Sequence, residues 1–208
     1  MHRTGSSTPW AKRGVFFGMM AAVGLLMVFP REGWTTDAFA LYQSAKPQLP
    51  VKFEYPADWQ VEESSGSQEA YAQVQVYGPS SLEPRLRTYL VVRAVPSKTG
   101  GGRYASLEEM ISAFRDTLQP GLRIDGTHPA QVAGGSATQV EVSGQLWLPW
   151  ESPKAVPVPV KSQRVFLERG GRFYEFAWMA TPEVSGQVGA AFSRLLDTFT
   201  VITEEGGS

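Results

Sequence analysis

Hydrophobic and polar residues alternate along residues 71–78, which read YAQVQVYG. Ala72, Val74 and Val76 fall on one side of an extended chain, and tyrosines and glutamines fall on the other. A period of two is typical of a β-strand with one solvated face. Residues 88–95 (TYLVVRAV) are apolar on both sides, which predicts a strand nearer the centre of a sheet.

Two segments show the apolar repeat of an amphipathic helix. The first begins at Ser106, whose hydroxyl can accept the N–H of Glu109 in a capping box. Its stripe consists of Leu107, Met110, Ile111, Phe114 and Leu118. The second follows Thr181-Pro182-Glu183, where the threonine is the predicted N-cap. Its stripe consists of Val184, Val188, Ala191, Phe192, Leu195, Leu196 and Phe199.

Glycine pairs separate the remaining predicted strands. Gly134-Gly135 and Gly170-Gly171 each lie between two apolar, alternating segments and predict tight hairpins, because glycine readily adopts a positive φ. Residues 149–160 contain four prolines, which cannot donate to a sheet, so this run is predicted to be a loop or a sheet edge. Strand runs interrupted by single helices favour an α+β fold with an antiparallel sheet.

The N-terminus has the layout of a secretory signal peptide. A basic start precedes residues 15–29, fifteen apolar residues without a charge, and an A-x-A site follows at 38–40. Such a helix is roughly 22 Å long, short of a bilayer core of about 30 Å. We expect cleavage after Ala40 and a periplasmic or secreted domain. The alternative is a chain anchored by an uncleaved segment.

Composition and charge exclude several classes of function. The chain has 208 residues and a formal net charge of -1, so it has no general attraction to nucleic acid. It contains no cysteine, and His128 is the one histidine that would remain after signal cleavage. A tetrahedral nitrogen or sulfur metal site is therefore not expected. We expect neither a metal nor a cofactor, and no enzymatic activity.

Two candidate sites have little support from the residues around them. A hydrolase would have to use His128, but the G-x-S-x-G elbow is absent, so we interpret His128 as a surface residue. Residues 98–103 (KTGGGR) lack the P-loop pattern and are predicted to be a loop. Arg103 lies in that loop, near the N-terminus of the first helix, where it could contact an anion.

Trp147 and Trp150 lie at the start of the proline-rich run, on either side of Pro149. Proline-rich loops are rarely buried, so both tryptophans are predicted to be partly exposed. Tryptophan with one end in water is a common anchor at interfaces. We therefore predict that Trp147, Pro149, Trp150 and Arg103 contact a partner.

The stretch FEYPADWQV (53–61) is predicted to form a strand, a turn at Pro56 and a second strand that restarts at Trp59. Together with the C-terminal FYEFAWMATPEVSGQVGAAFSRLLDTFTV, it resembles the PsbP-like superfamily. The resemblance rests on Tyr55, Pro56, Trp59 and Phe199 as structural residues. It covers about residues 51 to 202.

This resemblance implies an α/β/α sandwich with a central antiparallel sheet and helices on both faces. Together with the signal (1–40) and a proline-containing linker without periodicity (41–50), it divides the chain into these two segments, a PsbP-like domain (51–203) and a disordered tail (204–208). Its members, among them PsbP, LpqN-type lipoproteins and Ran-binding Mog proteins, resemble binding or assembly modules without catalysis. The metal contacts of plant PsbP have no match here, so a photosynthetic role is not implied.

Three functions follow in order of preference. The first is an extracytoplasmic binding module for an envelope protein or membrane-associated complex, including peripheral membrane association. It predicts an exposed patch near Trp147 and Trp150 and no buried ionisable cluster. The second is a carrier of a small amphiphile or lipid, which requires an apolar cavity of about 300 Å³ or more. The third is a hydrolase using His128.

Overall fold

The computed structural model of the chain describes residues 38–66, 71–80, 86–150 and 152–202. Within these ranges the chain forms two antiparallel sheets, two α-helices and one short 3-10 helix, η1 (Lys98–Gly100). The predicted α+β class is therefore confirmed. The predicted signal before residue 38 and the predicted tail 204–208 lie outside the described residues.

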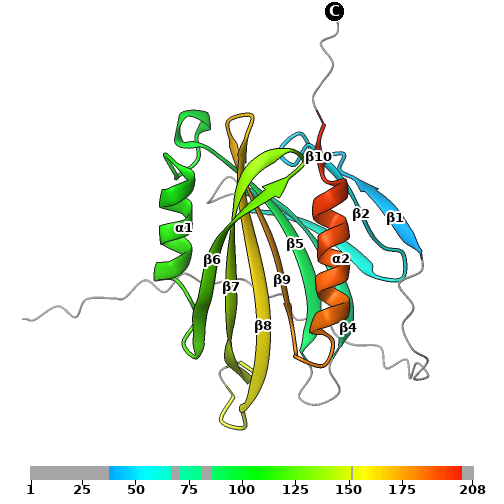
Figure 1. Cartoon of the computed structure of the whole chain (residues 1–208), viewed down its shortest axis with the longest axis vertical. Helices are drawn as coiled ribbons and strands as arrows, with labels where there is room; N and C mark the ends of the chain where they lie inside the picture. Colours follow the sequence, from blue (N-terminus) through cyan, green and yellow to red (C-terminus); the bar gives the residue numbers. More distant parts are fainter. Residues whose placement is uncertain (1–37, 67–70, 81–85, 151, 203–208) are drawn as a thin grey trace, which may run out of the picture. The chain divides into compact units, whose positions relative to one another are not determined.

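The larger sheet has seven strands, and each hydrogen-bonds antiparallel to its neighbours. Their order is β3 (Gln60–Gly66), β4 (Tyr71–Ser80), β5 (Arg87–Pro96), β9 (Arg172–Ala180), β8 (Val156–Arg169), β7 (Gly135–Leu148) and β6 (Leu122–Val132). The smaller sheet has the order β1 (Phe39–Gln43), β2 (Val51–Pro56) and β10 (Thr200–Val201). Figure 1 shows these strands with the two helices.

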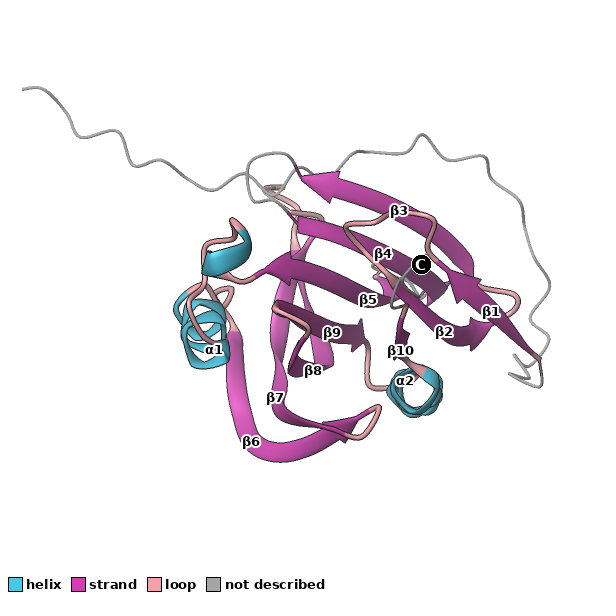
Figure 2. Ribbon diagram, turned by 90° about the horizontal axis from the view of Figure 1, so that it is seen from above, coloured by secondary structure: helices cyan, strands magenta, loops and turns pink. Residues whose placement is uncertain are grey.

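The two helices pack on opposite faces of the seven-stranded sheet (Figure 2). Strand β9 shows why, because its side chains point alternately to the two faces. Tyr174, Phe176 and Trp178 join a core with α2 (Ser185–Thr198) and the smaller sheet. Phe173 points the other way and packs with α1 (Leu107–Asp116). Both faces of β9 are buried, which explains its nearly continuous apolar sequence.

The ends of the helices follow the predicted signals only in part. Ser106 caps α1 by accepting the Glu109 N–H at 3.2 Å, as predicted, and the Glu109 carboxylate accepts the N–H of Ala105 at 2.7 Å. Helix α2 begins at Ser185, so the predicted N-cap at Thr181 is wrong by several residues. Residues 182–184 form a turn, in which the Val184 N–H bonds the Thr181 carbonyl at 3.2 Å.

Both predicted hairpins are present, but the predicted turn at Gly134-Gly135 is off by one residue, because Gly135 already belongs to β7. Gly170 and Gly171 connect β8 to β9 with φ of 60° and 71°. Ala133 and Gly134 connect β6 to β7 with φ of 50° and 74°. Two consecutive positive φ values match the twist of the paired strands.

The proline-rich run differs from a simple loop. Residues 149–155 connect two strands, but residues 156–160 belong to β8 and pair with residues 144–148 of β7. The pairing of β8 with β9 begins at Lys161, so among the described strands this part of β8 has one neighbour. Pro157 and Pro159 can therefore point their nitrogens to the open side. The predicted edge is correct, whereas the predicted loop ends at Ala155.

The corner at residues 53–61 connects the two sheets. Strands β2 and β3 flank the turn as predicted, but they pair with different partners instead of with each other. Trp59 is 5% exposed and its ring lies against Gly78 of β4, where an added Cβ would be 2.7 Å from the indole carbons. Phe199 packs edge-on against Phe176, with ring centroids 4.7 Å apart.

The predicted linker 41–50 is partly a strand. Residues 41–43 belong to β1, which pairs with β2 along its whole length from Phe39 to Gln43. Alternation is visible only over this short stretch, and burial of Tyr42 and Leu49 holds the segment on the core. Of the prolines that suggested a linker, Pro47 lies in the turn after β1 and Pro50 directly precedes β2.

Candidate functional site

The end of the β7–β8 hairpin exposes several large apolar side chains. Trp147 is 54% exposed, Trp150 44% and Val156 45%. Pro149 between the tryptophans is also exposed. The predicted partial exposure of both tryptophans is confirmed, and their contact with a partner stays a prediction. We call Trp147, Pro149, Trp150, Val156 and Pro157 the hairpin end.

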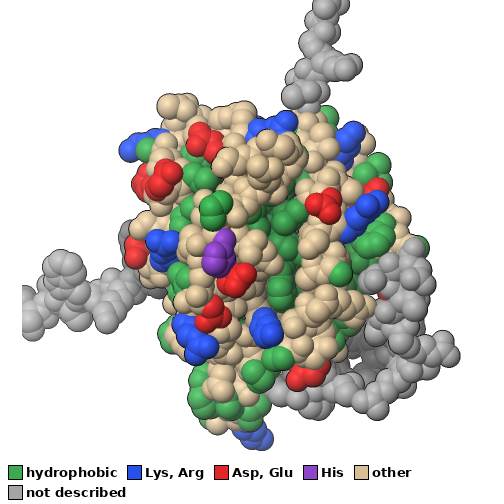
Figure 3. Space-filling model, viewed as in Figure 1, with side chains coloured by type: hydrophobic (Ala, Val, Ile, Leu, Met, Phe, Trp, Pro, Cys, Tyr) green, Lys and Arg blue, Asp and Glu red, His purple; other side chains and the backbone are tan. Residues whose placement is uncertain are grey.

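The side chains on the opposite face of β7 and β8 are buried, and they hold the hairpin end in place. Trp147 pairs with Pro157, and the neighbouring pairs Leu148–Val156 and Leu146–Val158 alternate with it. Leu146 and Leu148 are buried, in a cluster formed by Leu86, Leu146, Leu148, Val158, Val160 and Met179. Trp147 therefore projects from a strand whose register is fixed by burial. Figure 3 shows hydrophobic side chains gathered at the lower end of the view, over this hairpin.

Arg103 does not lie near the hairpin end. Its loop is tied to the turn between β8 and β9, where the N–H of Ser97 bonds the carbonyl of Gly171 at 3.0 Å. Residues 156 and 171 lie at opposite ends of β8 and its turn, so the sheet separates Arg103 from Trp147 and Trp150. The Arg103 guanidinium is 4.5 Å from the ring centroid of Tyr104. Arg103 therefore does not belong to the hairpin end, and its contact with a partner stays a prediction.

His128 is exposed on β6 and pairs with Gln139 of β7. Among the described residues, no hydrogen bond or ion pair involves its side chain. A surface depression of about 420 Å³ lies on the same hairpin, lined by Pro129, Ala130, Gln131 and Ser136. It is open and its lining is mostly exposed, so it is not the enclosed apolar cavity that a lipid carrier requires.

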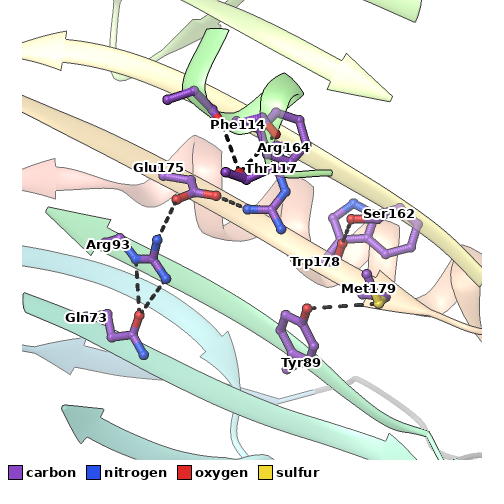
Figure 4. Close-up of polar contacts among 11 residues, drawn as sticks. Gln73, Tyr89, Arg93, Phe114, Thr117, Ser162, Arg164, Glu175, Trp178 and Met179 are labelled. Carbon is purple, nitrogen blue, oxygen red and sulfur yellow. Dashed lines mark hydrogen bonds and ion pairs between the residues drawn. The ribbon is translucent and has the colours of Figure 1, made fainter. Parts of the chain in front are cut away.

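A row of charged and polar side chains crosses four strands of the sheet on the face that packs α1 (Figure 4). Glu175 of β9 is buried with 6% of its side chain exposed. One carboxylate oxygen accepts from Arg93 of β5 at 3.3 Å, and the other accepts from Arg164 of β8. Arg93 also donates to Gln73 of β4 at 3.1 and 3.2 Å. We call Gln73, Arg93, Glu175 and Arg164 the charged row.

The charged row contradicts the expectation that no ionisable cluster is buried. Each charge is tolerated because its partners satisfy it at short range. Burial lowers the pKa of Arg164, and the guanidinium stacks 4.5 Å from the ring centroid of Phe114 in α1. The sequence carried a partial signal for this row. Glu175 and Arg93 each interrupt a mostly apolar strand, and a buried charge needs a partner.

Metal chemistry has little material among the described residues. No three side chains of histidine, aspartate or glutamate lie close enough there to hold an ion together. Likewise, none of the helices in the described ranges is long and apolar enough to cross a bilayer.

Comparison with known proteins gives structural likeness at low sequence identity. No family model and no curated protein sequence matches the chain. Similar solved structures include cyanobacterial PsbP (CyanoP) from Synechocystis sp. PCC 6803, with 12% identity and a TM-score of 0.48, covering 89% of this chain and 98% of that chain. LpqN, described as involved in cell envelope biogenesis of Mycobacterium tuberculosis, is 14% identical with a TM-score of 0.47, covering 80% of this chain and 91% of that one.

A third similar structure is the protein PA94 from Pseudomonas aeruginosa, described as of unknown function, with 17% identity and a TM-score of 0.43. It covers 74% of this chain and 91% of that chain. CyanoP and LpqN are the kinds of protein to which the sequence resemblance pointed, and both are found among the similar structures.

Proposed function

We propose that this chain is an extracytoplasmic, non-catalytic binding module that attaches to an envelope protein through the hairpin end. One observation carries the proposal: Trp147, Trp150 and Val156 are each exposed by 44–54% and gather at one end of one hairpin. Exposed tryptophan in a patch is unusual on a monomer surface and is enriched where proteins bind. The extracytoplasmic location rests on the signal-like N-terminus.

The hairpin end suits a protein partner better than a lipid surface. Trp147 sits on a strand of fixed register opposite Pro157, and Trp150 follows Pro149 in the turn after β7. Little freedom is therefore lost when Trp147 binds. A membrane anchor of this size would need basic residues for anionic lipids. The net charge of -1 offers no such excess, and charges of both signs are scattered over the face in Figure 3.

We also infer that the arrangement is the α/β/α sandwich of PsbP-like domains. The packing of α1 and α2 on opposite faces of the larger sheet supports this reading. The absence of catalysis is likewise part of the proposal. It is supported by His128, whose side chain makes no hydrogen bond or ion pair within the part of the chain that the structure describes, and by Glu175, whose carboxylate is bound by two arginines.

The decisive experiment compares three purified domains in pull-downs from the envelope fraction of the source organism. We expect one or more proteins to be enriched by the wild type and by Leu41→Ala, and lost with Trp147→Ala/Trp150→Ala. Leu41 is a matched control because it is 64% exposed but lies on β1. Enriched proteins are then purified, and their direct affinity for the three domains is measured. Equal affinity for all three would remove the proposed surface.

A vesicle flotation assay separates the protein partner from a membrane. Vesicles with and without anionic lipid are mixed with the wild type and the double variant. We expect neither domain to float. If the wild type floats and the double variant does not, the hairpin end is a membrane anchor and the proposed protein partner is wrong.

A further inference from the structure

The first strand of the domain includes residues that the sequence pattern assigns to the signal peptide. Strand β1 begins at Phe39, and residues 39–43 pair with residues 52–56 of β2. One residue earlier, the carbonyl of Ala38 accepts the N–H of Ala57 at 3.0 Å. The A-x-A segment is therefore the start of the folded domain, although the same segment has the pattern of a cleavage site.

The side chain of Phe39 connects β1 with α2. The guanidinium carbon of Arg194, in α2, lies over the Phe39 ring at 5.7 Å from its centroid. The same guanidinium binds one carboxylate oxygen of Glu54 in β2, at 2.6 and 2.8 Å. A cation over an aromatic ring is attracted by the ring. Phe39 therefore helps to hold α2 on the smaller sheet.

Cleavage after Ala40 would remove these contacts from the mature protein. The chain would begin at Leu41, and β1 would lose the pairs that Phe39 and Ala40 make with β2. Arg194 would also lose the ring that lies against it. A secretory chain is processed as it crosses the membrane, before it folds, so the fold does not shield the bond. The cost falls on the product, which would fold with a shortened first strand.

A second pair of small residues lies two positions earlier in the sequence. Thr36 and Ala38 occupy the third and first positions before Phe39, which is the spacing of an A-x-A site. Cleavage after Ala38 leaves β1 complete. It removes one backbone acceptor, that of the Ala57 N–H, and Ala57 is exposed, so water can take its place.

We propose that a signal peptidase hydrolyses the bond between Ala38 and Phe39, so that the mature protein begins at Phe39. Water adds across this peptide bond. The released segment ends in the carboxylate of Ala38, and the domain begins with the α-ammonium group of Phe39. The proposal rests on the extracytoplasmic location proposed for the chain, and it does not depend on the hairpin end or its partner.

Intact mass and N-terminal sequencing of the chain recovered from the source organism, with cytoplasm and envelope analysed separately, test the proposal. We expect an envelope chain that begins at Phe39. Thr36→Tyr places a large side chain three positions before the proposed bond and should reduce this product roughly tenfold. Ala40→Ile enlarges the residue before the other candidate bond and should leave the product unchanged.

Two outcomes would overturn the proposal in distinguishable ways. An envelope chain that begins at Leu41, or that keeps its N-terminal segment, would show that the processing site is wrong and leave the location intact. A full-length chain confined to the cytoplasm would overturn the location, and the processing site with it.

Thermal unfolding of the mature protein tests whether the fold uses Phe39. We expect Phe39→Ala to lower Tm more than Leu41→Ala, a matched control on the same strand whose side chain is 64% exposed. In an Arg194→Met background, Phe39→Ala should lower Tm by less than it does in the wild type, because the two side chains interact. If Phe39→Ala has the Tm of the wild type, the fold does not need Phe39 and the proposal is wrong.

Discussion

Replacing Trp59 by alanine should lower the stability of the domain without affecting its binding surface. The side chain is 5% exposed and packs against Gly78, so its removal creates a cavity that the backbone of β4 cannot fill. Loss of a buried tryptophan costs about 3–5 kcal/mol. The indole N–H of Trp59 is buried without a hydrogen-bond partner. Alanine removes that penalty, so we expect a cost near the lower end, about 3 kcal/mol.

This loss is large against a typical domain stability of about 5–15 kcal/mol. For a domain of this size each kcal/mol lowers Tm by roughly 2–4 °C, so the expected drop is roughly 6–12 °C. Urea unfolding followed by circular dichroism measures the free energy, and a thermal scan measures Tm. The slope of the unfolding free energy against urea concentration should equal that of the wild type, because the substitution changes the stability of the folded state and not the compactness of the unfolded state.

Trp147→Ala is the matched control, because it makes the same substitution at a position that is 54% exposed. We expect its stability to change by less than about 0.5 kcal/mol, as for most surface substitutions. The opposite pattern would refute this assignment. In that case Trp59→Ala would keep the stability of the wild type but no longer bind the partner, and Trp147→Ala would either unfold or bind the partner as well as the wild type. Trp59 would then be a binding residue and not a structural one.

Three further predictions concern other contacts. Gly78→Ala should lower the free energy of unfolding by about 1–3 kcal/mol, because the added methyl group clashes with the ring of Trp59. In urea unfolding, the double variant Trp59→Ala/Gly78→Ala should lose much less stability than the two single variants added together, because the clashing ring is absent. The hydrogen bond from Tyr42, at 2.6 Å, is the main cause that lowers the pKa of Glu63 below its ordinary 4.5. NMR titration of Tyr42→Phe should therefore show a higher Glu63 pKa. The stability lost in this variant should be full above pH 4.5 and shrink as pH falls, because a lowered pKa stabilises only the ionised form. Ser106→Ala should cost about 1 kcal/mol through loss of the α1 cap, whereas Ser106→Asp should retain most of it.

The sequence patterns predicted local elements well where a single interaction decides them. The Ser106 cap, the glycine hairpins and both apolar stripes depend on neighbours within a few residues. The start of α2 was misjudged because proline and threonine at 181–182 suit a turn as well as a helix start. The β1 strand was missed because its partner β2 lies beyond a turn and its pairing buries few side chains.

The sites show the same division. Exposure of Trp147 and Trp150 followed from the surrounding prolines, which is local information. The charged row depends on cross-strand register, which brings Arg93 opposite Glu175 and Gln73 opposite Arg93. The separation of Arg103 from the tryptophans could not be predicted for the same reason, because it is set by the length and direction of β8.

Residues 156–160 of β8 pair on one side only among the described strands, and this limits how any partner can approach. An unpaired strand edge is ordinarily a template on which a strand from another chain can add, and many assemblies and aggregates form in this way. Pro157 and Pro159 carry no N–H, so alternate positions along this edge lack the donor that a new strand would need. A partner must therefore recognise side chains here and not the backbone. The same two prolines also protect the hairpin from edge-to-edge pairing with further copies, which lets the chain expose two tryptophans with less risk of self-association.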